Sequence, residues 1–111
     1  MWQDTFDEET IKRELGWANQ RLRMNALRVF IHVLVWMDNP TKFFQRLDTF
    51  LNISSANNLK VMLVLFDECW NPNGTLGQQP QPIPGVHNSQ WVRCPGQDML
   101  TNKSSWPILS R

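Results

Sequence analysis

The stretch that decides the fold is residues 60–66, KVMLVLF, in which six of seven residues are apolar. A short, continuous apolar run of this kind is typical of a parallel strand that is covered on both faces. An earlier run, residues 26–32, is also rich in β-branched and aromatic side chains. We therefore predict two strands, at residues 26–32 and 60–66.

A helical pattern precedes each predicted strand. The first begins after Asp7, a favourable N-cap that two glutamates follow, and its apolar residues recur at helical spacing (Ile11, Leu15, Ala18 and Leu22). The second begins at Asn39-Pro40, because proline at the first helical position gives up no needed hydrogen bond, and it fades near residues 57–58. Two helix–strand units in succession predict an α/β fold with parallel strands and right-handed crossovers.

The chain changes character after the second predicted strand. Residues 71–107 hold six of the seven prolines and four of the five glycines, without a helical period. We expect a long irregular loop over residues 67–107, and an irregular stretch of that length is either functional or a sign that more of the domain exists. Two parallel strands also leave both sheet edges and the apolar helix faces in need of cover. The sequence therefore predicts a piece of a larger α/β protein.

Composition excludes several classes of function. The chain has 111 residues, with eleven Lys and Arg against ten Asp and Glu, so no field favours nucleic acid or an anionic membrane. No apolar run is long enough to span a bilayer. The two cysteines and two histidines lack metal-ligand spacing, and we expect neither a metal nor a cofactor. The first residues lack signal-peptide features, whereas N-x-[ST] sequons give slight support to secretion (Asn52, Asn73 and Asn102), so the cellular location is left open.

Polar residues on the first predicted strand are candidates for a site. Arg28, Phe30 and His32 share one face, and the aliphatic residues between them share the other, which fits against helices. A charge inside a barrel is costly unless it is paired, so we expect a polar or acidic partner for a buried Arg28. The alternative is that Arg28 belongs to a structural ion pair only.

Asp67 follows the second predicted strand directly. Polar residues just past the carboxyl end of a parallel strand lie where such folds place their active sites. Asp67 could accept hydrogen bonds from a sugar hydroxyl or orient a neighbouring His or Arg, and alternatively it caps the following turn. Asp67 and Glu68 are not an acid–base pair, because neighbours on a strand face opposite sides. The pairing of Cys69 and Cys94 is left open.

Three tryptophans come at or after the predicted strand ends, namely Trp36, Trp70 and Trp91. Indole faces are flat apolar platforms on which the C–H faces of pyranose rings stack, and His87 and Asn88 could supply polar contacts. Core packing beneath a long loop is the alternative for any single tryptophan. Several at one end of the same strands favour a binding surface.

These residues resemble a family in several segments. They are residues 1–3 (MWQ), 5–7 (TFD), 14–18 (ELGWA), 28–30 (RVF) with Asn25, His32 and Trp36, the helix around 43–51, 64–67 (VLFD) with Cys69, Trp70 and Pro72, and 85–89 (GVHNS) with 91–92 and 95–96. Over nearly its whole length the chain resembles a group of cellulase-like (β/α)8 glycoside hydrolases, the endo-1,4-β-xylanase and cellulase-superfamily proteins. It departs from them at Arg23-Met24, where the family usually has Gly-Phe, at Val33, where it tends to have Asp, and after Met99.

The resemblance implies that residues 1–111 are the N-terminal part of one TIM-barrel catalytic domain, about two α–β units with the loop 67–107 at the carboxyl face. It implies retaining hydrolysis of O-glycosyl bonds in a β-linked polysaccharide. The catalytic Glu pair belongs at the ends of the fourth and seventh strands, and no residue here matches either position. The chain alone is then expected to be inactive, with carbohydrate and the remainder of the barrel as its partners.

The resemblance also assigns roles to residues of this chain. Arg28, His32 and Asp67 become supporting groups around the missing carboxylates, and a sugar subsite is shaped by Trp70, His87, Asn88 and Trp91. Trp36 is counted with these substrate-binding or supporting residues. Two other hypotheses remain: a catalytically dead chain that still binds carbohydrate, and a nonfunctional remnant of such a barrel.

Overall fold

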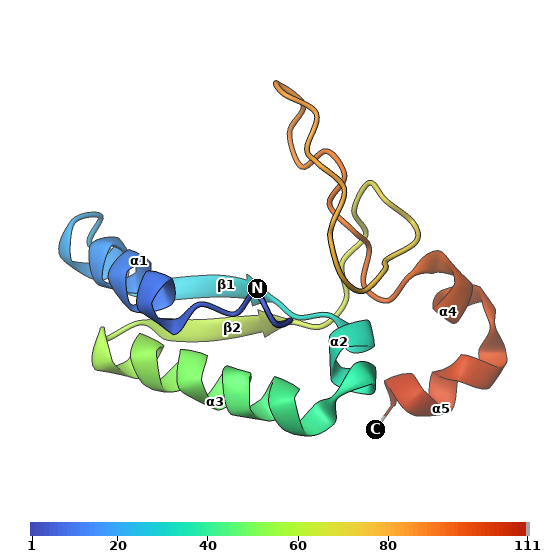
Figure 1. Ribbon diagram of the computed structural model, residues 1–111, viewed down its shortest axis with the longest axis horizontal. Coiled ribbons are helices and arrows are strands. Elements are labelled where there is room, and N and C mark those ends of the chain that lie inside the picture. The colour runs from blue at the N-terminus through green and yellow to red at the C-terminus, as the bar shows by residue number, and fades with distance from the viewer. Residues whose placement is uncertain (111) are drawn as a thin grey trace.

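The computed structural model describes residues 1–110 of the chain. Its elements are α1 (Glu8–Gln20), β1 (Ala26–Phe30), α2 (Val33–Asp38), α3 (Pro40–Ala56), β2 (Lys60–Val64), α4 (Gln97–Thr101), the 3-10 turn η1 (Lys103–Ser105) and α5 (Trp106–Leu109) (Figure 1). β1 and β2 pair in parallel, with Ala26 opposite Lys60 and Phe30 opposite Val64. The prediction of a mixed α/β chain with two parallel strands is confirmed.

The starts of both long helices follow from their capping residues. The carboxylate of Asp7 accepts a hydrogen bond from the Thr10 backbone N–H at 3.1 Å, ahead of the acidic first turn of α1. The Asn39 side chain accepts from the Lys42 N–H at 2.9 Å, and proline occupies the first turn of α3. Side-chain acceptors at these positions satisfy backbone donors that the helix itself leaves free, as the sequence predicts.

Both strands are shorter than predicted. They end at Phe30 and Val64 instead of at residues 32 and 66, and the short helix α2 follows β1 directly. The reason lies in His32, whose Nδ1 accepts a hydrogen bond from the Leu34 N–H at 3.2 Å and so caps α2. His32 therefore does not continue the strand face of Arg28 and Phe30, which corrects the prediction.

The core lies on one side of the sheet. Val29 of β1 packs there against residues of both long helices and the N-terminal segment, which are Trp2, Ile11, Phe43, Leu47, Phe50 and Ile53. Leu27 and Ile31 pack against the same cluster. The prediction that the aliphatic face of the first strand meets the helices is thus confirmed.

The opposite face of the sheet is open. Met62 is 60% exposed, and Arg28 is also exposed, with its guanidinium carbon 5.2 Å from the centre of the Phe30 ring. Arg28 is not buried in the described residues 1–110, and no carboxylate among them lies within salt-bridge distance of it, so the partner expected for a buried Arg28 is not found in this part of the chain. The guanidinium group of Arg28 lies over the aromatic ring of Phe30 instead.

The two turns that lead from a helix into a strand share one backbone feature. Arg23, between α1 and β1, and Asn58, between α3 and β2, both have a φ of 55°. This left-handed conformation is routine for glycine and tolerated by asparagine, but it is strained for arginine. Each of the two helix–strand turns thus contains one residue in the left-handed conformation.

The segment after β2 folds back on itself and then projects from the rest of the chain (Figure 1). Asp67 and Cys94 exchange two backbone hydrogen bonds, of 2.7 and 2.9 Å, and a second bridge joins Asn71 to Val92. The expected irregular loop 67–107 differs in its last part, where α4, η1 and part of α5 lie. Each of these is at most five residues long, too short to give a periodic signal in the sequence.

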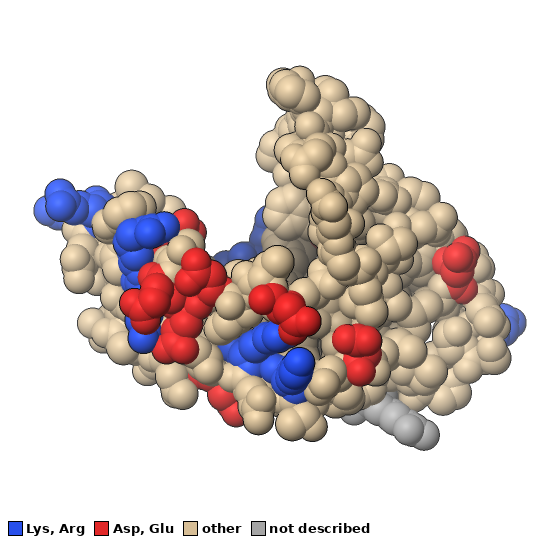
Figure 2. All heavy atoms as spheres, viewed as in Figure 1, with Lys and Arg blue, Asp and Glu red and all other residues tan. Residues whose placement is uncertain are grey.

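Charged side chains are unevenly distributed over the molecule. In Figure 2 they gather over α1 and α3, whereas the projecting loop carries none. One ion pair joins Arg46 of α3 to Asp4 at 2.7 Å. The sequence agrees, since residues 69–92 contain no Lys, Arg, Asp or Glu. Among residues 1–110, no helix is both long and apolar enough to cross a membrane.

Candidate functional site

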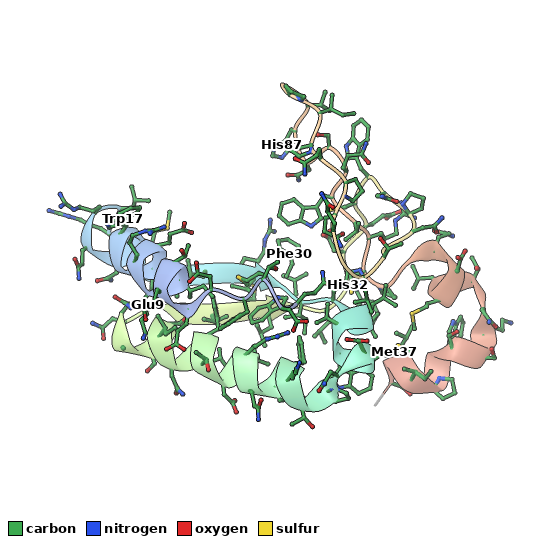
Figure 3. All side chains as sticks on the ribbon, viewed as in Figure 1. Glu9, Trp17, Phe30, His32, Met37 and His87 are labelled. Carbon is green, nitrogen blue, oxygen red and sulfur yellow. The ribbon has the colours of Figure 1, made fainter. Side chains whose placement is uncertain are left out.

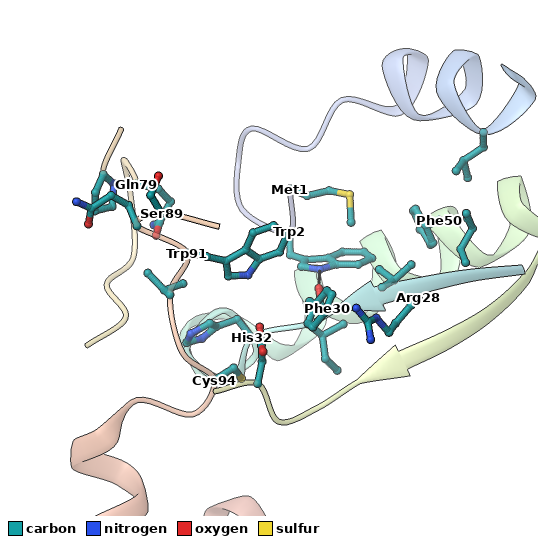
Figure 4. Close-up of a pocket in the computed structure, with 18 residues that line it drawn as sticks. Met1, Trp2, Arg28, Phe30, His32, Phe50, Gln79, Ser89, Trp91 and Cys94 are labelled. Atoms are coloured by element: carbon teal, nitrogen blue, oxygen red, sulfur yellow. Dashed lines mark hydrogen bonds between the residues drawn. The ribbon is translucent and has the colours of Figure 1, made fainter. Parts of the chain in front are cut away.

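A cavity of about 640 Å³ lies where β1 meets the returning loop (Figure 4). Four of the eight residues singled out in the sequence line it: Arg28, His32, Asp67 and Trp91. The fold therefore brings these four together from two strand ends and a loop far along the chain. Trp36, Trp70, His87 and Asn88 do not line this cavity.

An aromatic pair forms one wall of the cavity. The rings of Phe30 and Trp91 meet edge to face, with centroids 5.6 Å apart and an interplanar angle of 69°. Phe30 lies between Trp91 and Arg28 (Figure 4). Because Trp91 remains 45% exposed, part of its indole is free for a flat apolar partner.

His32 uses both ring nitrogens to hold the backbone. Since Nδ1 accepts from the Leu34 N–H, the ring proton lies on Nε2, which donates to the Arg93 carbonyl at 3.0 Å. Burial lowers the pKa of His32 below 6.5, and the bond to Arg93 opposes this only in part. A Cβ on Gly74 would lie 2.8 Å from Nε2, so the loop packs closely on the imidazole. Through these contacts His32 links the end of β1 to the loop.

Asp67 is the one carboxylate among the described residues that lines the cavity. Its Oδ2 accepts a hydrogen bond from the Cys69 thiol at 2.9 Å. Burial and then the neighbouring Asp67 carboxylate raise the pKa of Cys69 to about 11, so this thiol is protonated at neutral pH. The second carboxylate oxygen of Asp67 makes no hydrogen bond within residues 1–110, and it can accept one from a ligand.

The two cysteines are not bonded to each other. Cys94 is buried, and its thiol donates to the Leu65 carbonyl at 3.2 Å. Both thiols thus hold the chain where it leaves β2: Cys69 through Asp67, and Cys94 through Leu65. The sequence left open whether Cys69 and Cys94 pair, and in the structure both are free thiols.

The other four candidates lie elsewhere. Trp36 lines a second cavity, of about 380 Å³, whose walls come from α2, α3, the end of β2 and α5 and are almost wholly apolar. Trp70 is 61% exposed and contributes to neither cavity. His87 lies toward the tip of the projecting loop (Figure 3), and Asn88 beside it is exposed. None of these three exposed residues lines either of the two cavities.

Several residues of the cavity were missed in the sequence. Trp2 is buried, and its indole N–H donates to the Phe30 carbonyl at 2.8 Å, which holds the N-terminal segment against β1. Gln3 and Gly77 exchange two hydrogen bonds, of 2.6 and 3.3 Å, and tie the same segment to the loop. Gln79, Ser89 and Gln90 complete the lining. The sequence feature that could have pointed to these residues is the composition of segment 69–92, which has no charged side chain and is rich in amide side chains.

No group of three potential metal ligands occurs among residues 1–110. Comparison of the chain with protein-family models, with curated proteins and with solved structures finds no match in any of the three. The resemblance to cellulase-like glycoside hydrolases therefore rests on the sequence segments quoted above.

Proposed function

We propose that this chain forms part of a (β/α)8 glycoside hydrolase barrel that acts on a β-linked polysaccharide with retention, and that its larger cavity binds sugar. The observation that carries the proposal is a cavity that extends along β1 and past its carboxyl end to Asp67, which follows β2, with an exposed indole beside it. Active sites of parallel α/β folds lie at that end of their strands.

The arrangement of the elements supports a barrel. Helix–strand–helix–strand order, a parallel pair and a helical layer on one face are the repeating unit of a (β/α)8 fold. The open face that carries Arg28 and Met62 would then point to the barrel interior, where further strands cover it. The free strand edges would pair with those strands.

The chemistry of the cavity supports a neutral, hydroxyl-rich ligand. Its loop wall offers an indole and an uncharged amide side chain (Trp91 and Gln90), and no charged residue occurs in segment 69–92. Sugars combine apolar C–H faces with hydroxyl groups, which suits a flat aromatic surface next to polar groups. The free oxygen of Asp67 adds one strong acceptor for a sugar hydroxyl.

The residues that line the cavity are not sufficient for hydrolysis. Glycosidic cleavage takes two carboxyl groups on opposite sides of the bond, and Asp67 is alone here. The proposal assigns the acid/base and the nucleophile to strands of the barrel outside this chain. There Arg28 would lower the pKa of a nearby nucleophilic carboxylate and keep it ionised. The isolated chain is then a sugar-binding part without turnover.

Binding of xylo-, cello- and manno-oligosaccharides to the chain tests this proposal, followed by tryptophan fluorescence and titration calorimetry. We expect dissociation constants in the millimolar range, and a loss of about fivefold in Trp91→Ala, since a stacked aromatic contributes about 1 kcal/mol. Trp70→Ala is the matched control, because Trp70 is exposed but lies outside the cavity. Absence of binding at about 10 mM sugar, or equal losses in both variants, would contradict the proposed site and favour a nonfunctional remnant.

A further inference from the structure

The exposed sequon Asn102-Lys103-Ser104, between α4 and η1, has a geometry suited to chemistry on its amide. The Ser104 hydroxyl donates a hydrogen bond to Asn102 Oδ1 at 2.7 Å, and the Ser104 backbone N–H donates to the same oxygen at 3.1 Å. Asn102 and Ser104 are both exposed. Within residues 1–110 the amide nitrogen Nδ2 of Asn102 makes no hydrogen bond, so it is free to meet another molecule.

The sequon at Asn52 lacks this geometry. Asn52 lies within α3, and its partner hydroxyl belongs to Ser54, which is 1% exposed. The Ser54 hydroxyl donates to the Phe50 carbonyl at 2.8 Å. A buried hydroxyl that is bonded inside the helix cannot assist an amide on the surface.

The sequon at Asn73 is held by different contacts. Its middle residue, Gly74, packs against the His32 ring, and the Thr75 carbonyl accepts from the Gln79 side chain at 2.8 Å. The Asn73 backbone N–H donates to the Asn71 side chain at 3.1 Å. Among the described residues no hydrogen bond joins the Thr75 hydroxyl to the Asn73 amide, so only Asn102 has its hydroxyl in place.

We propose that Asn102 is the residue at which the folded chain accepts an N-linked oligosaccharide, from a polyprenyl-diphosphate-linked donor in a reaction catalysed by an oligosaccharyltransferase. The Asn102 nitrogen attacks the anomeric carbon of the donor sugar, and a C–N bond forms as the C–O bond to the diphosphate breaks. The polyprenyl diphosphate leaves with the electron pair, and the amide nitrogen gives up one proton to a base of the transferase. Donation by the Ser104 hydroxyl polarises the amide and makes that proton more acidic.

The modification would leave the larger cavity open. Asn102 lines neither of the two cavities described above, and its segment begins beyond the Asp67–Cys94 bridge. The inference is therefore independent of the proposed sugar binding, and either can fail without the other.

The experiment incubates the folded chain with a purified single-subunit oligosaccharyltransferase and a polyprenyl-diphosphate-linked oligosaccharide, and maps the products by mass spectrometry. We expect one glycan, on Asn102, and a fall of at least about tenfold in occupancy in Asn102→Gln and in Ser104→Ala. Asn52→Gln and Asn73→Gln are the matched controls and should leave that occupancy unchanged. Thermal melting of each variant checks that the fold persists.

Three short peptides, each with one sequon, serve as the unfolded comparison. We expect all three to be modified, because the burial of Ser54 and the packing of Gly74 against His32 exist only in the folded chain. Preferential glycosylation of Asn52 or Asn73 in the folded chain would overturn the inference. So would a folded chain left unmodified at Asn102 under conditions that modify the Asn102 peptide.

Discussion

His32 connects the end of β1 to a segment about sixty residues later in the chain through the 3.0 Å bond from Nε2 to the Arg93 carbonyl. The imidazole is needed in its neutral form, because protonation of Nδ1 would remove the acceptor that caps α2. Burial depresses the pKa of His32 in the folded chain. The unfolded chain consequently binds more protons in the pH range just below 6.5, where the ring is still neutral in the folded state.

We predict that the free energy of unfolding falls as the pH is lowered from about 7.5 to about 5. The contribution of His32 is fully present above its unfolded pKa and is lost as the pH falls toward its folded pKa. His32→Asn should reduce this pH dependence to the part that comes from the Met1 amino group, whose pKa burial also lowers. The cost is about 1 kcal/mol at neutral pH for the lost bond to Arg93, because asparagine can still cap α2. Denaturant unfolding followed by circular dichroism over this pH range measures both effects.

His87 provides the control for that measurement, because it is exposed near the loop tip. His87→Asn should keep the full pH dependence of the parent chain. If His32→Asn retains the slope while His87→Asn loses it, the assignment to His32 is wrong.

At the scale of elements, the chain repeats a helix–turn–strand unit, and each of the two turns holds one residue in the left-handed conformation. The left-handed position is filled by Asn58 in the second turn and by Arg23 in the first, both at a φ of 55°. An asparagine side chain tolerates this conformation, whereas for most L-residues it costs about 1–2 kcal/mol. The first turn is thus the more strained of the two.

Arg23→Gly is therefore predicted to raise the free energy of unfolding by about 0.5–1 kcal/mol, since relief of the strain exceeds the added freedom of glycine in the unfolded chain. Arg23→Ala keeps the strained backbone and separates this effect from loss of the side chain; we expect a change within about 0.5 kcal/mol. Asn58→Gly should also be close to neutral. A gain in Arg23→Ala as large as in Arg23→Gly would mean that the arginine side chain, and not the backbone, is unfavourable there.

Local signals explain how much of the secondary structure could be predicted. The capping residues Asp7 and Asn39 act on the turn that follows them, and the apolar run of β2 is continuous, so both are visible in a short window of sequence. The true strand ends could not be found in that way. They depend on His32 and on the Asp67–Cys94 bridge, which bring together residues that are distant in the chain.

The same distinction applies to the candidate site. Arg28 and His32 are predicted from the alternation of the first strand, and Asp67 from its place after the second. Trp91 is predicted as one of the tryptophans at or after the strand ends. Which of the tryptophans faces the cavity is decided by the path of the loop. That path is held by backbone hydrogen bonds between segments distant in the chain, such as the bond from the Asn71 N–H to the Trp91 carbonyl at 2.9 Å, and no local pattern points to them.

At the scale of the whole molecule, the two-stranded sheet has two outer edges. The bonds from the Lys60 N–H to the Asn25 carbonyl and from the Ile31 N–H to the Val64 carbonyl fix which backbone groups face the partner strand. Because orientation alternates along a strand, the Met62 and Val64 amides of β2 point toward β1. The amides between them, at residues 61 and 63, point outward and have no partner within residues 1–110.

We therefore predict that amide hydrogen exchange along β2 alternates with a period of two residues. The Met62 and Val64 amides should exchange at least about tenfold more slowly than those of Val61 and Leu63, as measured by NMR. The measurement is repeated at a tenfold lower protein concentration to control for self-association. Equal, concentration-independent protection of all four amides would show that another segment already covers the edge. The alternation is also the pattern that a barrel requires before its next strand is added, since the outward amides of β2 are the donors with which that strand would pair.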